Sequence, residues 1–89
     1  MNKIKRKELL KIETRLASVK DVISDIKGDI EYVLADEENT LDNMERFFGT
    51  DRYASMEEAI GDMGNAVSAL EDAMDNIDSA IECIDNAQN

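Results

Sequence analysis

Large apolar residues recur every three or four positions through the last third of this chain, and this repeat limits the fold more than any other feature. Between residues 59 and 87 the spacing follows a heptad, the pattern of a helix whose apolar stripe packs against another helix. The stripe consists of Ile60, Met63, Val67, Leu70, Met74, Ile77, Ile81 and Ile84. Each heptad also has an alanine beside the stripe, at Ala59, Ala66, Ala73, Ala80 and Ala87. Such small residues allow a further helix to approach closely.

A second heptad run occupies the first third of the chain. Its apolar positions are Leu9, Ile12, Leu16, Val19, Ile23, Ile26, Ile30 and Val33. The 89 residues include no proline and only four glycines, which favours long helices over a sheet. We therefore predict an all-α fold in one domain, residues 1–89, as an antiparallel two-helix hairpin. The expected helices cover about residues 4–38 and 51–87, and the turn formers of residues 39–50 make the connector.

The two runs are matched in length and in charge. If Leu9 pairs with Ile84 at one end and Val33 with Ile60 at the other, each of the eight apolar residues of the first run faces one of the second. Residues 1–20 hold seven bases and two acids, whereas residues 53–89 hold nine acids and no base. The antiparallel pairing lays the basic start along the acidic end. It also lets Lys20 and Lys27 reach Glu71 and Asp78, pairs that select orientation more than they stabilise.

One side of the hairpin is predicted to self-associate. A chain of this length builds only a thin core, and a small fold commonly needs a partner. The sequence therefore predicts a homodimer, a four-helix bundle packed along the alanine side. The expected self-association residues are Val22, Ala59, Ala66, Ala73 and Ala80.

Composition argues against several classes of function. The net charge of −11 opposes direct binding to nucleic acid, whose affinity for proteins depends on Lys and Arg. With no histidine, the common nucleophile–base pairs and the Glu-x-x-His metal motif are absent, so we expect no enzyme, metal or cofactor. The lone Cys83 fits either a helix contact or an intermolecular disulfide or reactive thiol. No apolar run reaches the roughly 20 residues of a membrane span, and we expect a cytoplasmic protein.

Acidic residues concentrate where the connector is expected. Residues 21–62 hold thirteen acids and three bases. We call the following residues the acidic tip and regard them as a candidate partner-binding site: Asp29, Glu31, Asp36, Glu37, Glu38, Asp42 and Glu45. Nearby aromatics either cap the end of the hairpin or anchor a partner, and they are Phe47, Phe48 and Tyr53. Attraction to a basic surface and simple solubility both explain such a charge.

Several segments resemble a known group of proteins. They are N-K-I-K-R-K-E-L at the start, L-D-N-M in the middle, Arg52–Tyr53 and the alanine heptads. Together they resemble small acidic helical proteins of unknown function from phages and mobile elements of Gram-positive bacteria. The resemblance implies a non-catalytic role in a bacterial host cell, including inhibition of defence systems in the manner of anti-CRISPR proteins, some of which occupy nucleic-acid channels.

Two functional hypotheses follow from the sequence. The leading one is an inhibitor or binding module whose acidic tip docks on a basic surface of a nucleic-acid-binding protein. The alternative is a structural coiled-coil protein whose only partner is itself or another helix. The first predicts a basic partner that high salt releases, and the second predicts none.

Overall fold

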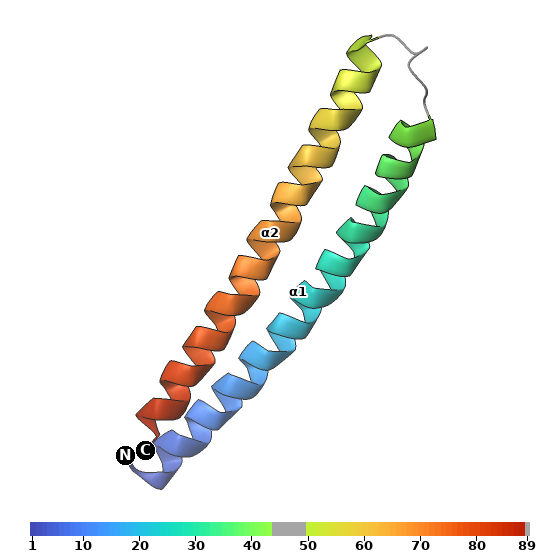
Figure 1. Cartoon of the computed structure of the whole chain (residues 1–89). Helices are drawn as coiled ribbons and strands as arrows, with labels where there is room; N and C mark the ends of the chain where they lie inside the picture. Colours follow the sequence, from blue (N-terminus) through green and yellow to red (C-terminus); the bar gives the residue numbers. More distant parts are fainter. Residues whose placement is uncertain (44–49, 89) are drawn as a thin grey trace.

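The chain is an all-α helical hairpin, as the two heptad runs predict. The computed structural model describes residues 1–43 and 50–88, in which α1 covers Lys3–Asn43 and α2 covers Thr50–Ala87. The helices run antiparallel side by side, and the two termini lie at the same end (Figure 1). The molecule measures 69 × 15 × 13 Å, so it is a long, narrow rod.

Helix α1 is longer than the sequence indicates at its C-terminal end. At its start, the Asn2 side chain accepts a hydrogen bond from the Lys5 amide at 2.8 Å, which caps the helix. At its other end, α1 continues to Asn43 rather than stopping near residue 38. The Thr40 hydroxyl donates to the Asp36 carbonyl at 3.0 Å. The Leu41 side chain is half-buried and lines a hollow with Ile60 of α2. Packing of Leu41 therefore outweighs the weak helix propensity of the surrounding Asn and Asp residues.

The hairpin has no closed core. Among the residues that the structure describes, none falls in the buried class, and the best-covered side chains are half-buried. Each helix of a pair can cover only one side of its neighbour, so an aliphatic seam between two helices stays open at both edges. Whatever stability the chain has beyond this seam must come from the groups along those two edges.

The seam on α2 is the predicted one, whereas the seam on α1 is turned. All eight predicted seam residues of α2 are half-buried. On α1, half of the predicted set is half-buried, namely Leu9, Leu16, Ile23 and Ile30. The other half is exposed, namely Ile12, Val19, Ile26 and Val33. Their place toward α2 is taken by the next residues along the chain, Glu13, Lys20, Lys27 and Leu34, all half-buried.

The pairing register also differs from the expected one. The predicted pairing puts Glu13 level with Ala80, but the Gln88 side-chain amide donates to Glu13 Oε2 at 2.9 Å. Eight residues of helix span about 12 Å, too far for these two side chains to bridge comfortably from level positions. The half-buried positions fit a pairing of Leu9 with Gln88 in place of Leu9 with Ile84, a shift of about one helical turn.

Candidate functional site

The exposed aliphatic residues of α1 form an open apolar face together with the alanines of α2. We define the open face as Ile12, Val19, Ile26 and Val33 of α1 with Ala66, Ala73 and Ala80 of α2. Ile12, Val19, Ile26 and Val33 are 38, 49, 46 and 53% exposed. They recur every seven residues, so they line one side of α1. Apolar side chains at such spacing on a helix normally contact another helix.

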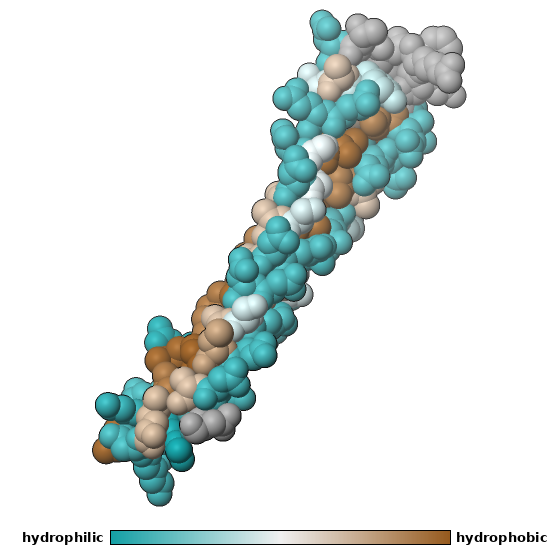
Figure 2. Space-filling view, turned by 60° about the vertical axis from the view of Figure 1, so that its left-hand side comes forward, coloured by the Kyte–Doolittle hydropathy of each residue, from teal (hydrophilic) through white to brown (hydrophobic). Residues whose placement is uncertain are grey.

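A groove in the open face shows how the two helices contribute to it. The groove has a volume of about 420 Å³ and is lined by Ile26, Asp29, Ile30, Val33, Asp62, Met63 and Ala66. Ala66 thus shares one hollow with the exposed residues of α1, and its small side chain leaves the space. In Figure 2, apolar side chains run in a broken line along the length of the rod between polar ones. The groove suits a side chain supplied from outside the hairpin better than a polar ligand.

The opposite edge of the seam is closed by polar pairs, and we call it the polar flank. Lys20 Nζ donates to both carboxylate oxygens of Asp78 at 2.8 Å. Lys27 Nζ lies 3.3 Å from Glu71 Oε1. The sequence predicts contact between these two lysines and these two acids, and the structure assigns the pairs. Gln88 with Glu13 adds a third contact. The aliphatic stems of the lysines cover the seam while their ammonium groups reach across it.

The polar flank also affects the protonation of one lysine. The hydrogen bond from Lys20 to Asp78 raises the pKa of Lys20 above its ordinary value of 10.5. The charges of Asp78, Asp75 and Asp21 add to this effect, and partial desolvation opposes it. The shift follows from a cation that gains a carboxylate partner on folding.

The acidic tip is only partly assembled as expected. Asp29, Asp36, Glu38 and Asp42 are exposed, as is Glu31, which lies 3.8 Å from Lys27 Nζ. Glu37 is half-buried, because it occupies the same heptad position as Leu9 and Ile30 on the α2 side of α1. Glu45 lies outside the described residues. The tip therefore presents fewer free carboxylates than a count of charges indicates.

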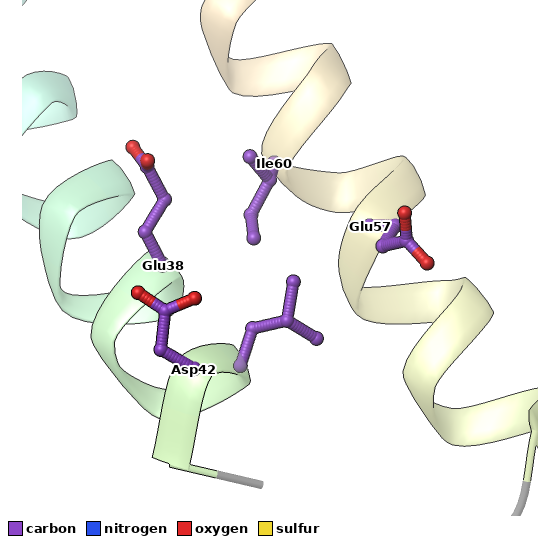
Figure 3. Close-up of a pocket in the computed structure, with 5 residues that line it drawn as sticks. Glu38, Asp42, Glu57 and Ile60 are labelled. Atoms are coloured by element: carbon purple, nitrogen blue, oxygen red, sulfur yellow. The ribbon is translucent and has the colours of Figure 1, made fainter. Parts of the chain in front are cut away.

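A small hollow lies between the helices near this end. It measures about 190 Å³ and is lined by Glu38, Leu41, Asp42, Glu57 and Ile60. In Figure 3, Ile60 points from α2 toward α1, and the carboxylates of Glu38 and Asp42 lie on the α1 side. In the parts of the chain that the structure describes, no three or more His, Cys, Asp or Glu side chains are placed to hold a metal ion.

The remaining candidate residues are widely separated. Phe47 and Phe48 lie outside the described residues, and Tyr53 is 38% exposed. Of the expected self-association residues, Val22 is 56% exposed and Ala59 is exposed, whereas Ala66, Ala73 and Ala80 are half-buried. Cys83 is a free, exposed thiol. The sequence predicts Ile12, Val19, Ile26 and Val33 in the seam, whereas all four are exposed on the open face.

Comparisons with known proteins do not assign this chain to a family. The chain matches no model of a protein family, no curated protein and no solved structure. Within residues 1–43 and 50–88, neither helix carries an apolar stretch of the length and hydropathy needed to cross a bilayer.

Proposed function

We propose that this protein works by helix–helix association, as a non-catalytic module that dimerises through its open face into a four-helix bundle. The observation that carries this proposal is the rotation of α1. In a two-helix coiled coil, both apolar positions of each heptad face the one partner helix. Here one of them faces α2 and the other, at Ile12, Val19, Ile26 and Val33, lies on the open face.

This arrangement suits a helix that has two neighbours. In a four-helix bundle the apolar stripe of each helix points to the bundle axis, and the residues beside the stripe contact the adjacent helices. The half-buried Lys20 and Lys27 have that flanking role toward α2. A second hairpin laid on the open face would cover the aliphatic side chains and the alanines together.

The test is the mass in solution. Sedimentation equilibrium at micromolar concentration should give about 20 kDa, twice the 10.0 kDa of one chain. Ile26→Asn should shift the protein toward monomer. Leu10→Asn is the matched control, because Leu10 is 52% exposed but lies outside the open face. A 10 kDa species at millimolar concentration would overturn the proposal.

A second candidate function uses the acidic tip. Among the described residues of the tip, only Glu31 lies in an ion pair, so the exposed carboxylates of Asp36, Glu38 and Asp42 keep their charge for a partner. This supports the hypothesis of a phage-type inhibitor in the host cytoplasm that docks on a basic surface of a nucleic-acid-binding protein. Such a role is compatible with dimerisation, because Glu38 and Asp42 lie outside the open face.

Charge-neutral variants test this second function. Asp36→Asn, Glu38→Gln and Asp42→Asn together should abolish salt-sensitive retention of a basic host protein in a pull-down. The control carries Asp72→Asn, Asp75→Asn and Asp85→Asn, an equal change in charge on α2 outside the acidic tip, and should retain the partner. Equal retention by both variants would reduce the tip to a solubility feature.

A further inference from the structure

The charge of α1 changes sign at the middle of its exposed aliphatic stripe. Residues 1–22 hold seven bases and three acids, a net charge of +4. Residues 23–43 hold one base and seven acids, a net charge of −6. A helix with this distribution attracts a second copy of itself that runs in the opposite direction and repels one that runs in parallel.

Val22 lies at this point and is the apolar residue that marks the centre of the stripe. It stands midway between Ile12 and Val33, and it is 56% exposed. One heptad before it is Arg15, and one heptad after it is Asp29, both exposed. Arg15 and Asp29 are equally far from Val22 and carry opposite charges, which suits a contact between two identical helices about a two-fold axis.

The alanines of α2 extend over the same level of the rod. The pairs Lys20–Asp78 and Lys27–Glu71 are one heptad apart on each helix. Their midpoint is near Ile23 on α1 and near Met74 on α2. Val22 and Ala73 lie on opposite sides of this midpoint, about 4.5 Å apart along the rod. A two-fold axis at the level of Val22 therefore crosses α2 between Ala73 and Ala80.

We infer that the occupant of the open face is a second copy of this chain in antiparallel orientation, with α1 against α1 and α2 against α2. This inference rests on the proposed function and adds the orientation. Ile12 faces Val33 of the second copy, and Val19 faces Ile26. Arg15 faces Asp29 of the second copy on each side of the axis. Ala73 lies near Ala80 of the second copy.

The charges at the two ends of the rod disfavour the parallel orientation. The loop end, residues 21–62, has a net charge of −10, whereas the remaining residues have a net charge of −1. A parallel dimer would place the two loop ends together, within reach of each other at the Debye length of about 8 Å in physiological salt. The antiparallel dimer places each loop end beside a nearly neutral end.

One contact opposes this arrangement at each end of the α1 pair. Two heptads from Val22, Glu8 meets Asp36 of the second copy. The ammonium group of Lys11 lies 3.6 Å from Glu8 and offsets its charge.

Disulfide trapping tests the orientation. In a Cys83→Ser background, one chain carries Ile12→Cys and a second chain, with a size tag, carries Val33→Cys. Oxidised glutathione should crosslink the mixture roughly tenfold faster than either chain alone, because bonding needs Cβ atoms about 3.5–4.5 Å apart. Ala35→Cys replaces Val33→Cys as the control, since Ala35 is exposed away from the stripe, and its mixture should stay slow.

The outcomes separate this inference from the proposed function. A dimer by sedimentation in which Ile12→Cys crosslinks to itself is parallel, which overturns the orientation and leaves helix association intact. A second mixture pairs Val19→Cys with Ile26→Cys. A dimer in which this mixture and the mixture of Ile12→Cys with Val33→Cys both crosslink slowly overturns the contact between the α1 helices. A monomer overturns both and assigns the open face to another protein.

Discussion

The two edges of the helix–helix seam differ in what completes them. On the polar flank, Lys20, Lys27 and Gln88 contact acidic partners across the seam within the same chain. On the open face, aliphatic residues at the same heptad spacing are 38–53% exposed. The chain thus satisfies its polar edge by itself and leaves its apolar edge to be covered.

The two edges therefore have different roles: the polar flank selects the orientation of the helices, and the open face offers apolar area for burial. Contacts across the polar flank select the antiparallel hairpin but contribute little stability, because exposed ion pairs gain modest energy in water. Burial of aliphatic area is worth about 25 cal/mol per Å², so most of the available stabilisation lies on the open face. Variants of the open face should therefore have larger effects than variants of the polar flank.

Ala73→Glu should have the largest effect. In the proposed dimer it brings two like charges together next to the two-fold axis, and an uncompensated buried charge costs roughly 3–5 kcal/mol. We expect a monomer by sedimentation, with partial loss of helicity by circular dichroism. Ser79→Glu is the control, because Ser79 is exposed in the heptad position of Asp72, on the side of α2 away from the seam. A variant that remains dimeric would place the interface elsewhere.

The heptad repeat shows which residues need burial but not which helix covers them. All eight seam residues of α2 could be predicted, as could the contact of Lys20 and Lys27 with Glu71 and Asp78. The rotation of α1 by roughly 50° could not, because the period of 3.6 residues is unchanged when a helix turns about its axis. The predicted contacts of Lys20 and Lys27 indicated this rotation, since they draw that side of α1 toward α2.

The candidate site was predictable in charge but not in placement. Counting acids locates the tip, yet Glu37 turns toward α2 because it continues the heptad of Leu9 and Ile30. The end of α1 was missed for a related reason. Asn39, Asp42 and Asn43 favour turns, but Leu34 and Leu41 extend the seam and keep the chain helical to Asn43.

Loss of aliphatic volume from the open face should have the next largest effect. Val19→Ala and Ile26→Ala remove side chains that the proposed dimer buries, and large-to-small changes in a closed core cost about 2–5 kcal/mol. A cost of about 1.4 kcal/mol already weakens the dimer tenfold. Sedimentation of each variant should show this weakening, whereas Leu10→Ala, outside the open face, should not. Equal effects of all three variants would mean general loss of helix stability instead.

Glycine substitutions should give a smaller effect of opposite sign. Gly28 lies on the outer side of α1 and Gly64 on the polar flank, in the heptad position of Glu71 and Asp78. A Cβ at either glycine meets nothing within 4 Å. Each change to alanine should raise the free energy of unfolding by about 0.5–1 kcal/mol through helix propensity. A loss of stability in Gly64→Ala alone would show that another helix covers the polar flank.

The smallest effect is expected for the ion pair of the polar flank. Lys20→Met keeps the aliphatic stem and removes the charge, so the melting temperature should fall slightly at low salt and be unchanged at high salt. Because folding raises the pKa of Lys20, its contribution is complete below pH 10.5 and is lost as the pH rises through the raised pKa. The melting temperatures of the wild-type protein and the variant should therefore converge in strong alkali. A difference that persists there would come from packing of the stem rather than from the charge. The dissociation constant of the dimer should not change in either case, since the polar flank and the open face lie on opposite edges of the seam.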